Sequence, residues 1–280
     1  MEARVQRRVQ RYGWDLAADS YESLWQMQLA EAQAEMLALT ALAPGESVLD
    51  VACGTGLVSF DAYRAVGPRG SVLGTDISSQ MVESAERRAA EQGFAGVRFE
   101  RMEAESLSSP DASFDVALCA LGLMYMPEPE QALRGMRRVL RPGGRIGLAV
   151  WGERARCGWA SLFSIVDAEV ASDVCPLFFR LGQPDALARA CRDAGFERIE
   201  ERRITVTLDY IDADQACDAA FVGGPVAMAW SRFDGSTRAR VRANYVEAIK
   251  PWRSGNGYQI PGEFVVLSGA AAPASDPLSA

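Results

Sequence analysis

Histidine is absent from the 280 residues of this chain. Ser-His-Asp hydrolases, Cys-His proteases and His-ligated metal sites all need an imidazole, so these function classes are excluded. A general base that works near neutral pH has to be a carboxylate, a tyrosine, a cysteine or the substrate itself. We expect no metal cofactor.

The cysteines form no C-x-x-C pair, and the chain lacks both a run of about 18 apolar residues and the residue order of a signal peptide. A disulfide framework is not expected in so long a chain without a secretion signal. We therefore expect reduced thiols, no membrane span and a cytoplasmic location. The six cysteines are Cys53, Cys119, Cys157, Cys175, Cys191 and Cys217.

Lysine is also scarce, since Lys250 stands alone against many arginines, and acidic residues outnumber basic ones to give a net charge of −8. One basic cluster has helical spacing: Arg4, Arg7, Arg8 and Arg11. We interpret this cluster as a solvated helix face, since so acidic a chain does not favour a nucleic-acid partner. A small-molecule substrate is expected instead, and the sequence does not indicate an oligomeric state.

Apolar strands and helices alternate between residues 44 and 151, after a helix expected at 14–42. The expected strands are 47–51, 72–75, 97–101, 114–119 and 145–151, and the expected helices are 57–66, 78–92 and 128–140. This alternation predicts a parallel sheet with helices on both faces.

The alternation is lost after Trp151. A helix is expected at 184–194, with strands at 198–209 and 263–267. The segments 153–181 and 211–260 contain helical stretches rich in aromatic residues, which suit an apolar ligand or could fill a core of their own. We expect one domain, with an N-terminal lid (1–43), a core (44–151), these two cap segments and a frayed tail (270–280).

A glycine-rich turn follows the first core strand, from Asp50 to Gly56. Small residues at 52, 54 and 56 allow a ligand to approach the backbone, and amides at the following helix start can act as donors. Dinucleotide enzymes use a similar turn. However, Ser59 stands where their fingerprint needs Gly or Ala, and Asp50 would repel a pyrophosphate but attract an ammonium or a sulfonium. Asp76 ends the second strand, where a carboxylate can bind ribose hydroxyls of either cofactor.

Several ordered motifs resemble the class I S-adenosylmethionine-dependent methyltransferases, in their small-molecule, quinone-biosynthesis-like branch. The motifs are Val48–Gly56, Thr75–Ser78 with Met81, Glu103–Glu105, Ser113–Val116, Met124–Tyr125 and Arg138–Gly144. The resemblance implies a Rossmann-like, doubly wound α/β sheet of seven strands. Its last strand, 263–267, would be antiparallel and lie between the fifth and sixth strands, and helical cap segments would be added to the sheet.

The resemblance also implies a cofactor site. Asp50 and Gly54 would hold the methionine end, Asp76 the ribose, and Glu103 the adenine amino group, with Tyr21 in the lid. The implied cofactor-binding residues are Tyr21, Asp50, Ala52, Gly54, Gly56, Asp76, Ile77, Met81, Glu103, Ala104 and Cys119. Glu105 is interpreted as facing solvent.

The implied activity is methyl transfer by in-line displacement to an N, C or O nucleophile of an apolar or aromatic small molecule, with S-adenosylhomocysteine as product. Expected acceptor-pocket residues are Met124, Tyr125, Trp151, Trp159 and Tyr258. No catalytic residue is predicted. Two alternatives stay open: an NAD-dependent oxidoreductase, and a catalytically silent cofactor-binding partner protein.

Overall fold

A computed structural model describes residues 2–170, 175 and 177–272. Within these residues every helix is too short or too polar to cross a bilayer. The expected frayed tail, 270–280, is wrong at its start, because residues 270 and 271 belong to a strand. Most of the remaining tail lies outside the described residues.

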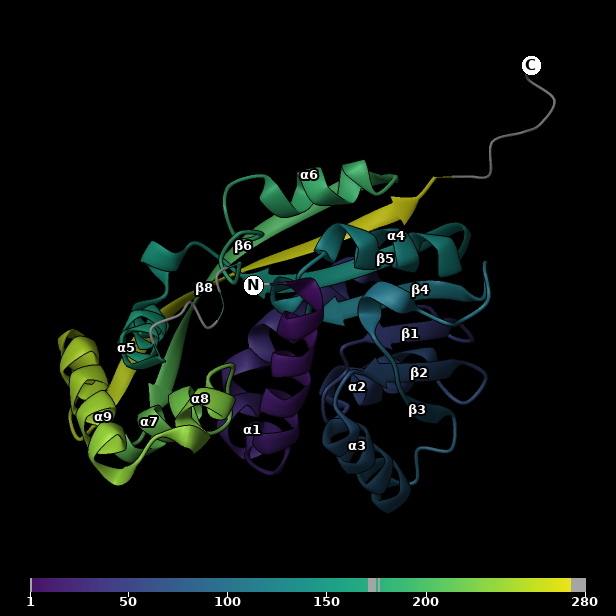
Figure 1. Cartoon of the computed structure of the whole chain (residues 1–280). Helices are drawn as coiled ribbons and strands as arrows, with labels where there is room; N and C mark the ends of the chain where they lie inside the picture. The colour runs from purple at the N-terminus through teal and green to yellow at the C-terminus, as the bar shows by residue number, and fades with distance from the viewer. Residues whose placement is uncertain (1, 171–174, 176, 273–280) are drawn as a thin grey trace.

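One mixed sheet contains every strand of the described chain, in the order β3-β2-β1-β4-β5-β8-β6, with β7 paired to β8 (Figure 1). The strands are β1 (Ser47–Val51), β2 (Ser71–Asp76), β3 (Val97–Arg101), β4 (Phe114–Ala120), β5 (Leu140–Trp151), β6 (Phe196–Tyr210), β7 (Arg253–Ser254) and β8 (Gly257–Ala271). β8 is antiparallel to both β5 and β6, which confirms the predicted insertion.

The sheet differs from the expected one in the number of strands and in strand bounds; β5, for example, begins at Leu140, five residues before the expected start at 145. A two-residue strand, β7, adds an eighth strand to the expected seven within the described chain. β8 also begins at Gly257, six residues before the expected start at 263. The early part contains Pro261, which pairs with β6 only, because β5 joins β8 from Phe264 onward. A proline is tolerated at such an edge because one side needs no N–H donor.

The helices follow the expected order, with one large exception at the N-terminus. They are α1 (Ala3–Thr40), α2 (Leu57–Val66), α3 (Ser79–Gln92), α4 (Pro129–Val139), α5 (Ser161–Val170), α6 (Ala186–Asp193), α7 (Ala213–Phe221), α8 (Ala227–Arg232) and α9 (Gly235–Ile249). α1 begins eleven residues before the expected start at 14. Its first buried positions are Gln6, Gln10 and Gly13, which lie on one helical face but give no apolar signal.

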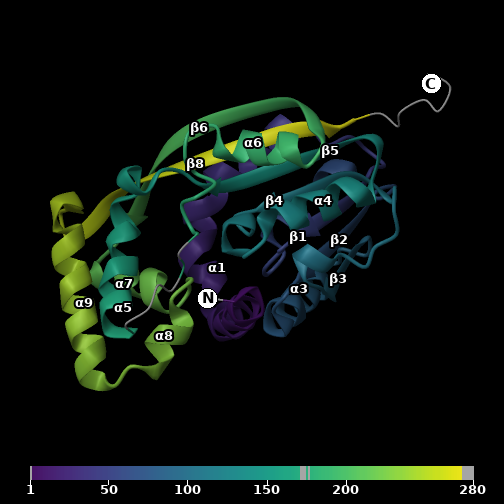
Figure 2. The ribbon, with the colours of Figure 1, turned by 45° about the horizontal axis from the view of Figure 1, so that its top comes forward.

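The order of the strands places the helices on the two faces of the sheet. α2 and α3 connect strands that proceed from β1 toward β3, whereas α4 and α6 accompany strands that proceed from β4 toward β6. Right-handed crossovers therefore put the two pairs on opposite faces. α1 lies with α2 and α3, as Figures 1 and 2 show.

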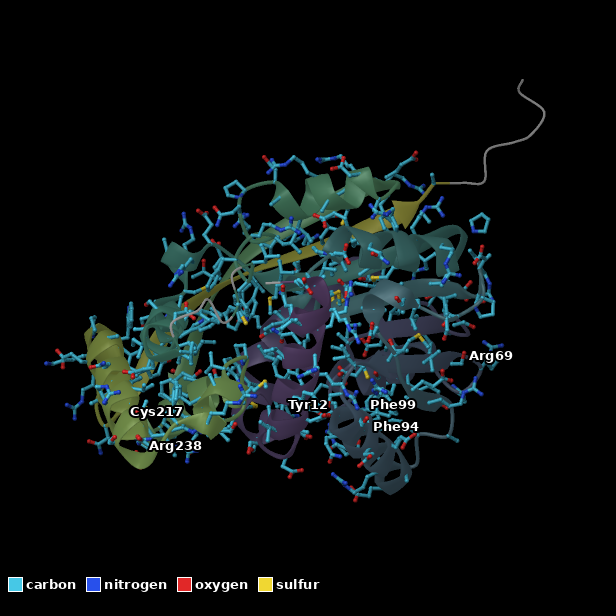
Figure 3. The ribbon with its side chains drawn as sticks, viewed as in Figure 1. Tyr12, Arg69, Phe94, Phe99, Cys217 and Arg238 are labelled. Atoms are coloured by element: carbon cyan, nitrogen blue, oxygen red, sulfur yellow. The ribbon has the colours of Figure 1, made fainter. Side chains whose placement is uncertain are left out.

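Aromatic rings fill the space between α2 and the outer strands. Phe60 stacks on Phe94 at 5.0 Å between ring centroids and meets Phe99 edge-on at 5.8 Å. Phe94 and Phe99 are labelled in Figure 3 at this end of the sheet. This packing fixes α2, and with it the turn that precedes the helix.

The cap helices α5, α7, α8 and α9 gather beside α1 at the other end of the sheet (Figures 1 and 2). Phe221 stacks on Trp230 at 4.7 Å and meets Tyr245 at 5.3 Å. These rings form a core of the cap itself. Of the two expected roles for the aromatic residues of segment 211–260, contact with an apolar ligand or a core of their own, these three rings have the second.

The C-terminal end of α1 crosses β5 at a glycine. A Cβ added to Gly147 would lie 2.2 Å from Thr40 Oγ1 and 2.9 Å from a methyl group of Leu118. Neither side chain has room to move away from such a Cβ, because Thr40 and Leu118 are both buried. The close approach of helix and sheet therefore depends on the missing side chain.

We predict that Gly147→Ala lowers the free energy of unfolding by about 1–3 kcal/mol, the usual cost of overpacking. Gly235→Ala is the matched control, because a Cβ there meets nothing within 4 Å. Urea unfolding of both variants measures the difference. Equal stability of the two variants would contradict the proposed close packing.

Candidate functional site

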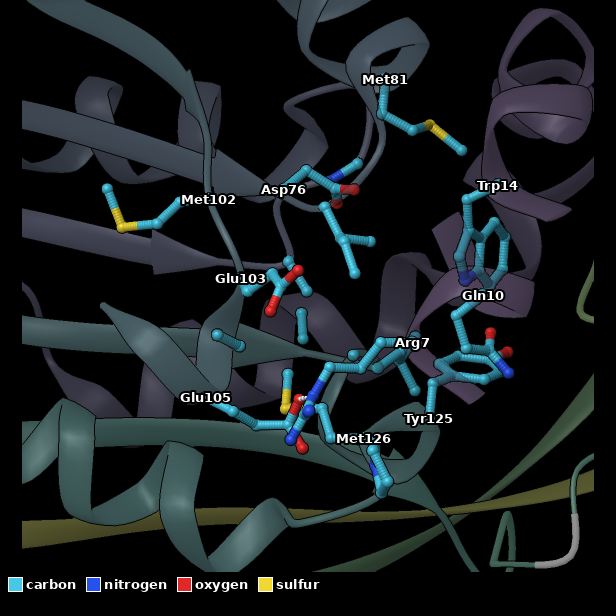
Figure 4. A pocket seen from close by; sticks show the side chains of 18 of the residues that line it. Arg7, Gln10, Trp14, Asp76, Met81, Met102, Glu103, Glu105, Tyr125 and Met126 are labelled. Atoms are coloured by element: carbon cyan, nitrogen blue, oxygen red, sulfur yellow. Dashed lines mark hydrogen bonds and ion pairs between the residues drawn. The ribbon is translucent and has the colours of Figure 1, made fainter. Parts of the chain in front are cut away.

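A cavity opens where the carboxyl ends of β1, β2, β3 and β4 meet the N-terminal half of α1 (Figure 4). Ligand crevices of doubly wound sheets form at this edge. The residues that line it are Arg7, Gln10, Trp14, Tyr21, Ala52, Gly54, Asp76, Ile77, Met81, Met102, Glu103, Ala104, Glu105, Ala120, Leu121, Gly122, Tyr125, Met126 and Pro127. We call this space the main pocket.

The turn after β1 adopts left-handed backbone at three positions, Ala52 (φ 57°), Gly54 (φ 56°) and Gly56 (φ 87°). Such a conformation is costly for alanine, and strain of this kind concentrates at functional sites. A Cβ at Gly56 would lie 2.9 Å from the Phe60 ring, so this glycine is needed for packing. Gly54 instead faces the main pocket, where its missing side chain leaves room for a ligand.

Asp76 ties this turn to the second strand. Its Oδ2 accepts a hydrogen bond from Gly54 N at 2.9 Å, and its Oδ1 accepts one from Ser78 N at 2.9 Å. Burial raises the pKa of Asp76 to about 6, although both backbone hydrogen bonds oppose the shift. Each oxygen has a second lone pair, so the carboxylate can still accept a ligand hydroxyl.

Asp50 is buried at the end of β1 and only half satisfied. Its Oδ2 accepts a hydrogen bond from Ser59 Oγ at 2.6 Å, whereas its buried Oδ1 has no partner among the described residues. Burial raises the pKa of Asp50 to about 7, and the charge of Asp76 adds to the shift. A buried acceptor without a donor calls for a cationic or N–H ligand group.

Asp50 lines a small side cavity next to the main pocket, together with Gln33 and Leu57. Four residues border both spaces: Tyr21, Ala52, Gly54 and Ala120. The two cavities therefore meet at the glycine turn, under the Tyr21 ring. An elongated ligand can lie across them with one end at Asp50, its middle at Asp76 and its other end at Glu103.

Glu103 and Glu105 both follow β3, but their carboxylates have different surroundings. The Glu103 carboxylate faces the main pocket and has no partner among the described residues (Figure 4). Glu105 is buried; its Oε2 accepts from Arg7 Nε at 2.6 Å, and its Oε1 accepts from Glu128 N at 2.8 Å. The expectation that Glu105 faces solvent is wrong, because a half-buried arginine of α1 pairs with it.

The Arg4–Arg11 cluster is likewise not a uniform solvated face. Arg4 and Arg8 are exposed, but Arg7 points to the main pocket and also pairs with Glu128. The ion pairs raise the pKa of Arg7, with the Glu105 hydrogen bond as the largest cause. Its charge is thus already balanced by two carboxylates.

A second cavity, which we call the aromatic cavity, lies between α1, the core and the cap. It is lined by Trp14, Tyr21, Trp25, Leu29, Leu121, Met124, Tyr125, Trp151, Trp159, Phe178, Gly224 and Pro225. Tyr21 and Trp14 form part of its wall and also line the main pocket, so the two spaces are neighbours. Trp14 meets Tyr21 and Tyr125 edge-on, at 5.8 and 5.1 Å.

The structure brings most of the expected site residues together. Eight cofactor residues border the main pocket, and Asp50 borders the side cavity. Gly56 and Cys119 line neither; Ala120, next to Cys119, does so instead. Four expected acceptor-pocket residues line the aromatic cavity: Met124, Tyr125, Trp151 and Trp159. Tyr258 is a correction, because it is buried on β8 opposite Tyr210 and lines none of these cavities.

Other pocket residues could not be found from sequence patterns. Gln10, Trp14 and Arg7 come from the part of α1 that carries no apolar periodicity. Leu121 has a left-handed backbone (φ 64°), a conformation that no sequence motif predicts for a leucine. The aromatic residues of α1 were the one available signal, because large rings on a charged helix suggest a partner surface.

Comparisons with known proteins agree with this geometry. A family model described as "Methyltransferase domain" matches residues 42–154. The ubiquinone/menaquinone biosynthesis C-methyltransferase UbiE of Ectopseudomonas mendocina (strain ymp) is 36% identical over 186 residues, which cover 60% of this chain and 71% of the relative. Nocamycin O-methyltransferase of Saccharothrix syringae is 28% identical over 249 residues, covering 82% and 87%.

A solved structure shows the same fold. An N-methyltransferase of Haemonchus contortus, in complex with S-adenosylhomocysteine, superimposes with a TM-score of 0.60 at 14% identity. The match covers 92% of this chain and 57% of that protein.

We predict a pH-dependent stability that comes from Asp50. In the unfolded chain this carboxyl ionises near 3.8, whereas the folded protein retains its proton up to a pKa of about 7. Folding therefore takes up a proton between these values, and stability falls as pH rises through this window. Melting temperatures of the ligand-free protein from pH 5 to 8 should decline more steeply for wild type than for Asp50→Asn, which cannot titrate. Parallel curves would contradict the raised pKa.

Proposed function

Since the chain belongs to the class I S-adenosylmethionine-dependent methyltransferases, in their quinone-biosynthesis-like branch, we propose that the main pocket and side cavity bind that cofactor and that the aromatic cavity binds the acceptor. The chain is an enzyme that transfers a methyl group from S-adenosylmethionine to a small-molecule acceptor. The oxidoreductase and silent-partner alternatives are not favoured. The observation that carries the proposal is the unpartnered, buried Oδ1 of Asp50 beside a glycine turn.

The residues fit the cofactor along its whole length. Asp50 would accept from the ammonium of the methionine end, and Asp76 from the ribose hydroxyls. Glu103 would accept from the adenine amino group, between Ile77 and Met81. When bound, S-adenosylmethionine supplies an electrophilic methyl group on a positively charged sulfur. A cationic ligand matches two buried carboxylates better than an anionic pyrophosphate does.

The aromatic cavity can position the methyl acceptor, but none of its side chains is suited to act as a base. No carboxylate, arginine or thiol of the described residues lines it. Its two hydroxyls, of Tyr21 and Tyr125, have pKa values raised far above the usual range, mainly by burial. An acceptor whose nucleophile is already unprotonated at neutral pH suits such a cavity.

We also propose that α1 and the two cap segments form the lid expected from the sequence. α1 borders all three cavities, and Trp159, Phe178, Gly224 and Pro225 of the cap segments line the aromatic one. A cytoplasmic location suits the six free thiols. The acidic chain and the neutralised Arg7 support a small-molecule partner over a nucleic acid.

A methyl-transfer assay tests the function. The protein is incubated with S-adenosylmethionine and a panel of phenols, naphthols, enolic ketones, aromatic amines and charged aliphatic amines, and S-adenosylhomocysteine is quantified. Mass spectrometry then searches for a product heavier by one CH2 group. A turnover with any panel member supports an apolar or aromatic acceptor. Turnover only with charged aliphatic amines would contradict it.

We predict that two carboxylate variants separate the two ends of the cofactor. Asp50→Asn should weaken S-adenosylmethionine binding by about tenfold to a hundredfold, the scale of a hydrogen bond to a charged group. It should leave 5′-methylthioadenosine, which lacks the amino-acid end, nearly unaffected. Asp76→Ala should weaken both ligands to a similar extent. Calorimetric titration measures all four affinities.

The melting temperature of each variant is the control for folding. If Asp50→Asn weakens both ligands equally, Asp50 does not contact the amino-acid end. If Asp76→Ala changes neither affinity, the ribose assignment is wrong.

A further inference from the structure

The guanidinium of Arg88 lies where three helices and the glycine turn meet. Arg88 belongs to α3, and only 16% of its side chain is exposed. Its Nη1 donates to the carbonyl oxygen of Thr55 at 2.8 Å, and its Nη2 donates to the Glu22 carboxylate of α1 at 2.7 Å. Its Cζ lies 5.2 Å from the centroid of the Phe60 ring of α2. One planar cation therefore connects α3 to α1, to α2 and to the turn.

The carbonyl that Arg88 binds belongs to the strained part of the glycine turn. Thr55 is buried and stands between Gly54 and Gly56, which both have a left-handed backbone. Such backbone persists only where the surrounding contacts over-determine it. Asp76 accepts a hydrogen bond from the Gly54 amide on the ligand side of the turn. Arg88 supplies a donor to the next carbonyl, so α3 fixes the turn by a second contact.

Glu22, the other acceptor of Arg88, follows the tyrosine that covers the cofactor site. Tyr21 borders the main pocket, the side cavity and the aromatic cavity. A Cβ added to Gly54 would lie 3.7 Å from the Tyr21 ring, so the ring lies against the turn. Because Tyr21 and Glu22 are neighbours on one helix, a contact that fixes Glu22 also fixes the position of the Tyr21 ring.

The shape of the arginine side chain matters more here than its charge. A third of the Glu22 side chain is exposed, and a partly exposed ion pair adds little stability by itself. The guanidinium, however, is a rigid fork of N–H donors, so it holds its two acceptors at a fixed separation. A lysine carries one nitrogen on a flexible stem and cannot hold the Thr55 carbonyl and Glu22 in the same way.

We propose that Arg88 is a positioning residue for the cofactor, which holds the glycine turn and the lid helix α1 together so that the Tyr21 ring covers the methionine end of S-adenosylmethionine. The inference rests on the proposed function of the main pocket and the side cavity. Arg88 lines neither of these two spaces. It therefore acts on the cofactor through Thr55 and Glu22.

The test measures two affinities by calorimetry, for S-adenosylhomocysteine and for 5′-methylthioadenosine, which lacks the amino-acid end. Arg88→Gln should weaken S-adenosylhomocysteine binding by about fivefold to twentyfold, the scale of one hydrogen bond to a charged group. It should leave 5′-methylthioadenosine nearly unaffected, because the turn and Tyr21 meet the other end of the ligand. Arg88→Lys should weaken S-adenosylhomocysteine almost as much, since it keeps the charge but loses the fork. Full recovery with lysine would overturn the proposal.

Arg64→Gln is the matched control. Arg64 also lies over a ring, with its Cζ 5.0 Å from the Phe94 centroid, and also forms an ion pair, but with Asp61 of its own helix α2. It contacts neither the turn nor α1, so its loss should change neither affinity. If Arg64→Gln weakens S-adenosylhomocysteine as much as Arg88→Gln does, the effect is general and the proposal is overturned.

A double-mutant cycle tests whether the lid contact acts through the Tyr21 ring. Glu22→Ala should weaken S-adenosylhomocysteine about threefold to fivefold in wild type, since Arg88 still holds Thr55. In a Tyr21→Leu background the same change should have almost no further effect, because residues that act as one unit are not additive. A purely structural contact would cost the same factor in both backgrounds, and that result would contradict the proposal.

The wild-type affinity separates this inference from the function on which it rests. If wild type does not bind S-adenosylhomocysteine, the proposed cofactor site fails. If wild type binds it and Arg88→Gln binds it equally well, only the role of Arg88 fails. If Arg88→Gln weakens both ligands to the same extent, with a lowered melting temperature, Arg88 is an ordinary structural residue and the inference is wrong.

Discussion

Two carboxylates are kept away from water at the ends of neighbouring strands, and the surrounding pocket is arranged around that constraint. Burial is the main cause that raises the pKa of both Asp50 and Asp76. A buried charge is tolerated only where donors face it. Ser59 from α2, Gly54 from the turn and Ser78 at the start of α3 supply three of these donors. The first turns of two helices and the glycine turn are thus positioned by the same requirement.

The lid helix α1 is held to the core of the protein by two kinds of contact. Its C-terminal half packs on β5 and β8 through buried apolar residues. Its N-terminal half is held by polar contacts: Ser78 Oγ donates to Asp15 at 2.6 Å, and Arg88 pairs with Glu22 at 2.7 Å. Arg7 adds an ion pair of 2.6 Å with the buried carboxylate of Glu105. Because separation would leave that carboxylate buried without its partner, this half of α1 is also fixed to the core.

The sequence predicts the strand-end residues well because the fold follows from a simple alternation. Parallel strands end at one edge, so Asp50 and Asp76 had to be neighbours once β1 and β2 were recognised. The start of α1 could not be predicted in this way. Its first buried residues are Gln6, Gln10 and Gly13, which are polar or lack a side chain and therefore give no hydrophobic periodicity. The aromatic cavity was predicted in part, through Met124, Tyr125, Trp151 and Trp159. The contributions of Trp25 and Leu29 were missed, because only tertiary packing brings these distant segments together.

The cofactor and acceptor spaces have opposite electrostatic character. The main pocket and side cavity contain several carboxylates, and the one arginine there is neutralised by Glu105 and Glu128. The aromatic cavity contains no charged side chain among the described residues, and its polar side-chain groups are two tyrosine hydroxyls and the N–H groups of its tryptophans. A cationic sulfonium between these spaces would face carboxylates on one side and a neutral, low-dielectric cavity on the other. In such surroundings an electron-rich acceptor oxygen or carbanion is attracted to the sulfonium itself, since no side chain of the cavity competes for it. An acceptor whose nucleophile is already unprotonated needs no base from the cavity, so the absence of histidine is compatible with the proposed methyl transfer.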